Sequence, residues 1–345
     1  MNSKALRNVL VILLVVIAGG LVYGAGILDP IFKPFSKKPR VVGVMYQPQH
    51  ITAYEGIKER MKKLGYSGRE IEYKEVLLTP GPTFNKDIED GAKKLIAEKV
   101  DVFFVTSEQM DKKLLELTAG TGVPIVFMTR FHDPLNYGLI KSYKSSGNNS
   151  TGVATNLVDT VQKNLFFFKE INPKIKKIGV FGEGFMVPGG SDEVLAEIKN
   201  QGLKFGLTIV EYKTKNPPDA TSKNWHEIAD KINPGDIDAL YHLGTHYYNV
   251  QETDETALAK RLRIPHSVPS VDIPTGGSFS FADDFHESAG QAAVMIDKIF
   301  NGAKPADIPI EFGSKSTLIL HLKRAAEAGF TFPNSMMSIA EVTIK

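Results

Sequence analysis

The chain has 345 residues, of which 42% are hydrophobic and 23% are charged, so it is globular rather than disordered and long enough for two domains. Its formal net charge of +2 gives no reason to expect nucleic acid or another strongly anionic partner. It contains no cysteine, which excludes disulfide bonds, cysteine-ligated zinc, thiol catalysis and a lipid anchor on an N-terminal cysteine.

Residues 1–40 predict a membrane anchor followed by a linker. Lys4 and Arg7 precede the uncharged run 9–28, which is long enough to cross a bilayer as a helix. The apolar region of a secretory signal peptide is usually shorter, ~7–15 residues. We therefore expect an uncleaved signal anchor, with a cleaved signal peptide as the alternative. Basic residues on both sides of the run leave its orientation open.

Residues 41–128 alternate between strand and helix patterns. Strands are predicted at 41–46, 70–78, 100–105 and 124–128, and helices at 52–64 and 85–99. Such alternation is typical of a parallel sheet with helices on both faces, so this part predicts a first α/β lobe.

A polar run then separates two well-patterned halves of the chain. Residues 145–152 contain serine, glycine and asparagine but no core-forming pattern. Glycine and asparagine tolerate unusual backbone angles, so the run is interpreted as a hinge between lobes. An ordinary surface loop is the alternative.

The strand and helix patterns resume after this run. Strands are predicted at 178–181, 207–212 and 239–243, helices at 156–171, 192–204, 222–232, 253–262, 284–300 and from 322, and further short segments at 279–282, 308–312 and 317–321. The second half therefore predicts another α/β lobe, although no repeat of the sequence itself is visible.

Three segments carry a resemblance to a known family. DPLNYGLIKSYKSSGNNSTGVA at 133–154 resembles the DP-x-x-x-GL-x-x-S…GGN-x-TG signature of the ABC-transporter substrate-binding protein family that includes tryptophan- and tyrosine-binding lipoproteins. FADDFHESAGQAAVMIDKIFNGAKPADIPIEF at 281–312 and TLILHLKRAAEAGFTFPNSMMSIA at 317–340 are similar to two later family segments, with His321 where asparagine is usual.

The resemblance implies an α/β fold of the type 1 periplasmic binding protein class, with two Rossmann-like lobes and a hinge that the chain crosses several times. It implies a first lobe of 41–150 plus 276–304 and a second of 151–275 plus 305–345. It also implies an extracytoplasmic solute-binding protein that serves an ABC permease and its ATPase, tethered here by the N-terminal helix. A ligand-sensing receptor coupled to a membrane signalling partner is the alternative.

A ligand site in an open parallel sheet lies at the carboxyl ends of the strands. The residues that follow the strands are Tyr46, Gln47, Thr106, Ser107, Thr129 and Arg130 in the first lobe and Glu183, Phe185, Thr245 and Asp272 in the second. Ser107 has the most specific reason to bind, since a hydroxyl beside a helix N-terminus accompanies backbone N–H groups that suit a carboxylate.

Each of these residues also has a structural alternative. Ser107 would serve as a helix N-cap in any protein. Tyr46 and Phe185 would pack at the cleft edge, and Arg130 would be a surface charge or pair with a nearby acid. Asp272 would cap the turn that follows it.

One departure from the family puts an amino acid ligand in doubt. Amino-acid-binding members carry an acidic residue just after the strand that corresponds to 241–243, where an ammonium group needs an anion. Here the matching place holds Thr245 or His246. Glu183 is a candidate for supplying that charge from another loop.

Competing chemistries have less support. His242 and His246 are four residues apart, but they span a strand end and a loop, so the spacing loses its meaning as a zinc motif, and His266 is remote in sequence. The glycines at 179–184 lack the third glycine of a dinucleotide fingerprint. No motif for a nucleophile or a P-loop is present. We expect no catalytic residue, metal or cofactor.

Overall fold

The computed structural model describes residues 38–79, 83–129, 132–154, 157–182, 190–214, 222–243, 252–269 and 276–345. Residues 40–345 form one compact unit. The predicted anchor at 9–28 lies outside the described residues. Among the helices that are described, none combines the length and apolar character needed to cross a membrane.

Within the described residues the first sheet has six strands, and every neighbouring pair is parallel. Their order is β11 (Glu311–Phe312), β5 (Ser150–Ala154), β4 (Ile125–Met128), β3 (Val102–Val105), β1 (Arg40–Tyr46) and β2 (Ile71–Leu77). Val42 and Val44 of β1 pack into one core cluster, while Val41 and Met45 pack into another. An uninterrupted apolar run forms this strand because both faces of the sheet are buried.

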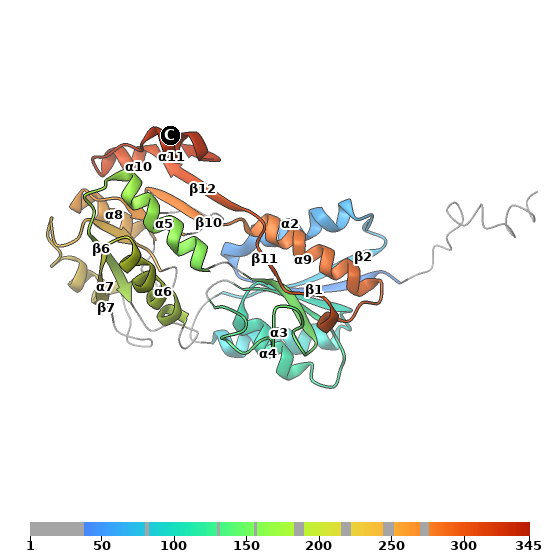
Figure 1. Cartoon of the computed structure of the whole chain (residues 1–345). Coiled ribbons are helices and arrows are strands. Elements are labelled where there is room, and N and C mark those ends of the chain that lie inside the picture. The colour runs from blue at the N-terminus through green and yellow to red at the C-terminus, as the bar shows by residue number, and fades with distance from the viewer. Residues whose placement is uncertain are drawn as a thin grey trace, which may run out of the picture. The chain divides into compact units, whose positions relative to one another are not determined.

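Two pairs of helices cover the two faces of this sheet (Figure 1). One face carries α2 (Ile51–Lys63) and α9 (Phe285–Phe300), and the other carries α3 (Phe84–Ala97) and α4 (Glu108–Leu117). Short 3₁₀ turns, η1 (Pro48–His50) and η2 (Pro305–Asp307), follow β1 and α9. The helix α9 thus joins the first lobe from the far end of the sequence.

The second sheet has seven strands among the described residues. Their order is β13 (Val342–Ile344), β12 (Ser316–His321), β10 (Phe279–Asp283), β9 (His266–Ser267), β8 (Ala239–Tyr241), β6 (Lys177–Gly182) and β7 (Thr208–Lys213). The β10–β12 pair is antiparallel and the other pairs are parallel. The predicted α/β class with two mostly parallel sheets is therefore confirmed.

Helices also cover the second sheet on both faces. One core cluster includes side chains from α5 (Leu157–Ile171), α6 (Gly190–Lys204), α10 (Leu322–Glu327) and α11 (Asn334–Ile339), and another includes side chains from α7 (Ser222–Ala229) and α8 (Glu252–Leu262). In the latter cluster Trp225 of α7 lies against Phe181 of β6, with 4.9 Å between ring centroids.

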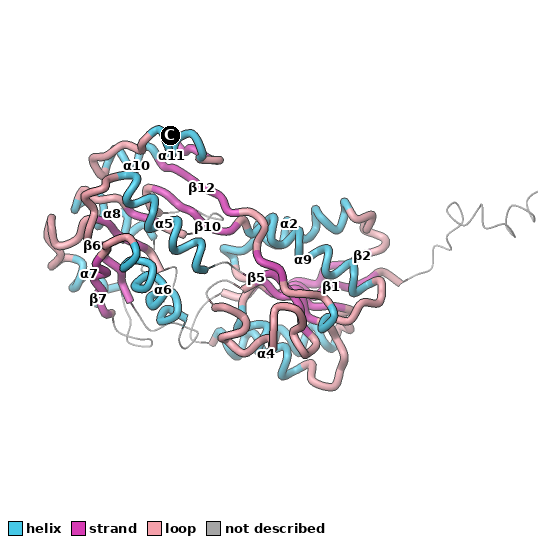
Figure 2. The backbone as a smooth tube through the Cα atoms, in the orientation of Figure 1, coloured by secondary structure: helices cyan, strands magenta, loops and turns pink. Residues whose placement is uncertain are grey.

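By sheet membership the described chain passes between lobes after β5, between β10 and α9, and between β11 and β12 (Figure 2). The hinge predicted at 145–152 is displaced, because Ser150 and Thr151 begin the buried strand β5. Their polar groups are satisfied inside the protein: the Thr151 hydroxyl donates to the Ile308 carbonyl at 2.9 Å. A strand held by backbone pairing needs no apolar pattern, which is why the sequence suggested a loop.

The predicted lobe boundaries also differ from sheet membership at two places. The resemblance places residues 276–304 in the first lobe, but β10 pairs with β9 and β12 of the second sheet. It places residues 305–345 in the second lobe, but β11 pairs with β5 of the first sheet. Both strands are short, and the partner of a short strand is decided by contacts far away in the sequence.

The docking of α9 depends on a close approach to α2 at Gly56. A Cβ atom at this position would lie 2.3 Å from the carbonyl oxygen of His286 at the start of α9. No side chain can yield there, because the obstacle is backbone. The two helices would have to move apart.

We expect Gly56→Ala to lower the free energy of unfolding by about 1–3 kcal/mol, the usual cost of overpacking, although alanine favours helix formation. Urea denaturation measures the change. Gly68→Ala is the control, since a Cβ there meets nothing within 4 Å. Equal stability of the Gly56→Ala protein and the unmodified chain would show that this approach does not limit the packing of α9.

Candidate functional site

The carboxyl edge of the first sheet brings together five of the predicted ligand contacts. Tyr46 ends β1 and Gln47 follows it, Thr106 and Ser107 follow β3, and Thr129 follows β4. These three strands are parallel neighbours, so the five residues lie at one edge. All five are buried. Their contact with a ligand remains a prediction.

Tyr46 is held by its own lobe. Its hydroxyl donates to Oε2 of Glu75 at 2.9 Å, and its ring centroid lies 5.2 Å from that of Tyr54. Burial, and then the hydrogen bond to Glu75, raise the pKa of Tyr46 to about 12, so the phenol stays protonated at neutral pH. This arrangement fits the packing alternative for Tyr46.

Ser107 is the N-cap of α4. Its Oγ accepts a hydrogen bond from the backbone N–H of Met110 at 3.3 Å. Glu108 and Asp111 occupy the first turn of the same helix and are both buried. The positive end of the helix dipole attracts anions, and an ionised carboxylate in the first turn would partly neutralise it for a ligand anion. The predicted anion site at Ser107 therefore has an acidic neighbour that the sequence argument did not weigh.

Asp111 is fully buried, and neither of its carboxyl oxygens has a hydrogen-bond partner among the described residues. Burial, and to a smaller extent the charge of Glu108, raise the pKa of Asp111 well above its ordinary value. The neutral acid is therefore favoured. Glu108, in contrast, accepts a hydrogen bond from the backbone N–H of His132 at 2.9 Å through Oε1.

His50 is a residue at this edge that the sequence did not predict. Its Nδ1 lies 2.9 Å from the hydroxyl oxygen of Thr106, and its ring meets the edge of the Phe285 ring at 5.2 Å between centroids. His50 is fully buried. It was missed because it lies in the turn η1, which has no periodicity, and its partners are distant in sequence.

A second unpredicted group connects the two lobes. His132, in the segment after β4, lies with Nδ1 2.7 Å from Oε2 of Glu193 on α6 of the second lobe. The backbone N–H of Asp133 donates to Oε1 of Glu193 at 3.3 Å. The His132 ring stacks on Tyr137, with 4.4 Å between centroids. One carboxylate from the second lobe thus receives bonds from two successive residues of the first.

The ionisation of Glu193 follows from these contacts. Burial alone would raise its pKa, but hydrogen bonds from His132 and from the Asp133 backbone outweigh burial and lower the pKa below its ordinary value. Glu193 is therefore charged at neutral pH. Asp133 is fixed in turn, because its carboxylate accepts from the Tyr143 hydroxyl and from the backbone N–H of Leu135.

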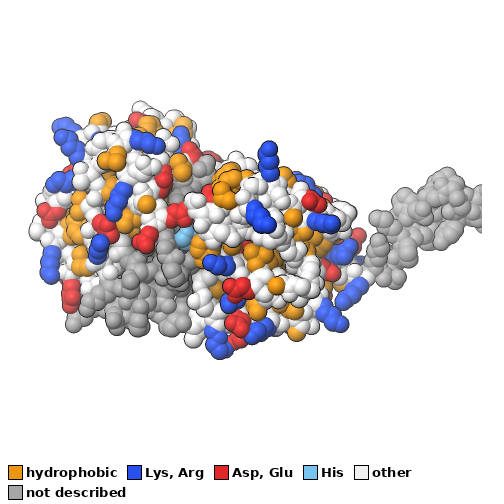
Figure 3. All heavy atoms as spheres, turned by 60° about the horizontal axis from the view of Figure 1, so that its bottom comes forward, with side chains coloured by type: hydrophobic (Ala, Val, Ile, Leu, Met, Phe, Trp, Pro, Cys, Tyr) orange, Lys and Arg blue, Asp and Glu red, His pale blue; other side chains and the backbone are white. Residues whose placement is uncertain are grey.

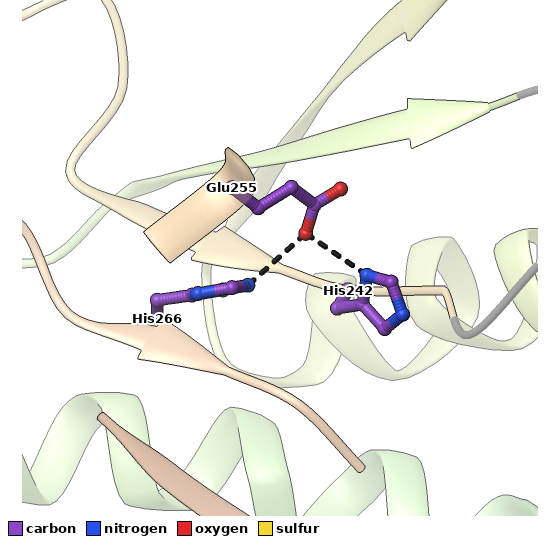
Figure 4. Close-up of side chains that lie close together, drawn as sticks. All are labelled: His242, Glu255 and His266. Carbon is purple, nitrogen blue, oxygen red and sulfur yellow. Dashed lines mark hydrogen bonds and ion pairs between the residues drawn. The ribbon is translucent and has the colours of Figure 1, made fainter. Parts of the chain in front are cut away.

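His242 and two other residues form a buried cluster in the second lobe (Figure 4). His242 follows β8, His266 lies in β9 and Glu255 lies on α8. One carboxylate oxygen of Glu255 is 3.0 Å from Nδ1 of His242 and 3.0 Å from Nε2 of His266. The sequence spacing suggested His246 as the partner of His242, but His246 lies outside the described residues. His266 was not considered a partner because it is distant in sequence. The pairing of β9 with β8 brings His266 next to His242.

The other predicted contacts lie outside the described residues. They are Arg130, Glu183, Phe185, Thr245 and Asp272. All four residues that the second lobe is expected to contribute to the site therefore remain a prediction from sequence.

The face drawn in Figure 3 carries both signs of charge. Lysine and arginine side chains are interspersed with aspartate and glutamate over the described surface of that face. This agrees with the small net charge of the chain.

Comparison with known sequences gives a match over nearly the whole described chain. A profile of the family described as ABC transporter substrate binding protein matches residues 40–344. The tyrosine-binding protein of Clostridioides difficile (strain R20291) is 23% identical over 300 residues, covering 84% of this chain and 81% of that protein.

Comparison with solved structures gives the same fold. An ABC domain from Streptococcus pneumoniae, solved in complex with L-Trp, has a TM-score of 0.71 and 20% identity, covering 89% of this chain and 100% of that one. The ligand-free, open structure of CD0873 from Clostridium difficile, a substrate binding protein with adhesive properties, has a TM-score of 0.66 and 20% identity, with the same coverage.

We expect Asp111→Asn to stabilise the protein at pH 7, because burial raises the pKa of the folded carboxyl group well above its ordinary value. The unfolded acid loses its proton near its ordinary pKa of 3.8, while the folded acid keeps it. Stability is therefore lost as the pH rises above that value, and asparagine avoids the loss. The difference should vanish in acid. Urea denaturation at several pH values measures it.

Asp90→Asn is the matched control. Asp90 is exposed on α3, and its hydrogen bond with Lys86 lowers its pKa. Its replacement should therefore not stabilise the protein at pH 7. If Asp111→Asn is no more stable than the unmodified chain at pH 7, the carboxyl group is not held neutral.

Proposed function

Because this chain belongs to the ABC transporter substrate-binding protein family, we propose that it is the extracytoplasmic solute-binding component of an ABC uptake transporter. It binds a small organic molecule between its two α/β lobes and closes around it. The observation that carries this proposal is the family match over residues 40–344, which spans both lobes. A permease with its ATPase is the expected partner.

Aromatic amino acids are the leading ligand candidates. One relative is named a tyrosine-binding protein, and one structure of the same fold was solved with L-Trp. An amino acid carries an ammonium and a carboxylate, so its site needs groups of both signs. The backbone N–H groups at the start of α4 would serve the carboxylate. Glu183 remains the proposed acid for the ammonium, since Thr245 or His246 stands where the family resemblance implies an acidic residue.

Closure would be stabilised by the bonds between Glu193 and the first lobe. These bonds exist only while α6 lies next to the segment after β4, so they belong to the state in which the lobes are together. A ligand that contacts both lobes favours the same state and shifts the population toward it. A relative of the same fold is described as open and ligand-free, which supports an opening motion in proteins of this kind.

The N-terminal segment would keep the protein at the membrane. The run 9–28 is uncharged, and the chain has no cysteine for a lipid. We propose that this run is an uncleaved anchor and that the residues before β1 act as a spacer containing Pro30, Pro34 and Pro39. The ligand-binding body would then remain within reach of a permease in the same membrane.

We expect an aromatic amino acid to raise the melting temperature of the protein in a thermal screen that also includes nucleosides, sugars and small carboxylates. A ligand at 100 times its dissociation constant stabilises the folded state by about 2.7 kcal/mol. A sugar or nucleoside as the only ligand would retain the binding function and exclude the amino acid assignment. No stabilisation by any class would contradict the proposal of a small-molecule receptor.

Ser107→Ala should reduce the ligand-induced shift, because it removes a hydroxyl at the proposed carboxylate site. It also removes an N-cap worth about 0.5–2 kcal/mol, so the shift on adding ligand must be compared, not the melting temperature alone. Ser107→Thr should retain both functions. Ser338→Ala, at an exposed position of α11, is the control for serine loss.

We expect Glu193→Gln to raise the dissociation constant about tenfold, which corresponds to about 1.4 kcal/mol. The closed state loses a charged hydrogen bond with His132, whereas an open state does not. Because the pKa of Glu193 is lowered, its contribution is complete above its ordinary pKa of 4.5 and is lost as the pH falls through the lowered value. Isothermal titration at pH 7 and near pH 4 measures both effects.

Glu197→Gln on the same helix is the control, because its partner is Gln201 of α6 itself. It should leave the affinity unchanged at both pH values. Should Glu193→Gln bind as tightly as the unmodified chain, the Glu193 bonds are not part of the ligand-bound state.

A further inference from the structure

His242, Glu255 and His266 form a buried cluster in the second lobe, and none of them is among the proposed solute contacts. Three separate elements supply it: the end of β8, the helix α8 and the strand β9. Glu255 and His266 are fully buried, and His242 is 4% exposed. In Figure 4 both rings point toward the same carboxylate oxygen. The three side chains are therefore held around one point inside the second lobe.

The residue types form a common ligand set for a transition metal. Two histidines and one glutamate are a known set for zinc, with a fourth position left for water. The nearest ligand atoms of all three residues lie within 4.8 Å of one another. Ligand atoms at 2.0–2.2 Å from a tetrahedral ion lie roughly 3.3–3.6 Å apart. Small movements of the side chains would therefore suffice to place an ion between them.

Charge also favours a cation at this point. A carboxylate taken out of water costs several kcal/mol unless opposite charge lies beside it. A divalent ion at this point would place a full opposite charge beside the Glu255 carboxylate, in addition to its contacts with His242 and His266. We propose that His242, Glu255 and His266 form a binding site for a divalent transition metal of the zinc class.

The ring proton of His266 can be accommodated when a metal binds. A histidine nitrogen that binds metal must present its lone pair, so its proton moves to the other ring nitrogen. Nδ1 of His266 lies 3.3 Å from the hydroxyl oxygen of Thr256. That oxygen already accepts the backbone N–H of Gly277 at 2.8 Å, and its second lone pair suits a proton on Nδ1. Thr256 would thus orient His266 for coordination.

A metal at this point would join parts of the chain that are separate in sequence. It would fix α8 against the ends of β8 and β9, next to the carboxyl edge of the second sheet. An ion that binds the folded chain and not the unfolded chain stabilises the fold. The site is therefore expected to act on the stability of the second lobe, independently of which solute the protein carries.

The test uses the full-length protein, purified without a histidine tag and treated with a chelator. Cobalt(II) is added as a spectroscopic probe, and zinc(II) is added in parallel thermal melts. We expect a single tightly bound cobalt ion per chain with visible ligand-field absorption of a tetrahedral nitrogen and oxygen site. We also expect zinc to raise the melting temperature and EDTA to reverse both changes.

Variants locate the ion. Glu255→Gln keeps the size of the side chain and one carbonyl oxygen, and it should abolish the cobalt spectrum. Thr256→Val should weaken metal binding about 10–100-fold, the usual effect of losing a residue that orients a ligand histidine. Thr256→Ser keeps the hydroxyl and should retain binding. Circular dichroism of each variant checks that the chain is folded.

The control is His286→Ala, which removes a more exposed histidine that pairs with Glu59 at 3.1 Å. This variant should bind cobalt like the unmodified chain. Absence of a cobalt spectrum and of zinc stabilisation in the folded unmodified protein would overturn the proposal and leave the cluster as a hydrogen-bonded carboxylate. Unchanged binding in a folded Glu255→Gln protein would overturn it too, since the ion would lie elsewhere.

Discussion

Both sheets of this protein must be covered on both faces, and the rest of the structure depends on that constraint. A parallel strand offers apolar side chains in two directions, as β1 does with Val42 on one side and Met45 on the other. Each crossover therefore places a helix on one face or the other. In the first lobe the face opposite α3 and α4 needs a second helix beside α2. The chain supplies it by returning from the second lobe as α9.

The same constraint determines where polar residues gather. Parallel strands send their carboxyl ends to one edge, and the helices that follow begin there. Residues at this edge form hydrogen bonds with the unpaired polar groups of helix ends and buried strand ends, whether or not a ligand is bound. Ser107 caps α4 and Thr106 pairs with His50. The structural and the ligand-binding interpretations of Ser107 are compatible, because its cap accepts from the N–H group of Met110 alone and a helix end has other N–H groups without an intrahelical partner.

Local order was predictable from the sequence, and pairing across distance was not. Periodicity located the strand that became β2 and the helix that became α3 within a few residues. It could not assign β10 to the second sheet or β11 to the first, because strands of a few residues take their partners from the whole fold. The carboxyl-edge rule correctly grouped residues of the first lobe. It could not find His50, because a histidine in a turn has no pattern that separates it from a surface residue.

The groups that sequence reasoning missed are also those whose burial requires a reason. Glu255, Asp111 and Glu193 come from three helices. The groups around each carboxyl group differ, and so does the way in which its loss of contact with water is compensated. Glu193 is compensated by hydrogen bonds from the other lobe and stays charged, whereas Asp111 has no hydrogen-bond partner within the described part of the chain and is driven toward its neutral form. Glu255 is fully buried between two imidazoles. At fully buried positions such as that of Glu255, apolar residues of similar size are often at least as stable. The presence of Glu193 and Glu255 is accounted for if Glu193 serves the closed state and Glu255 serves a cation.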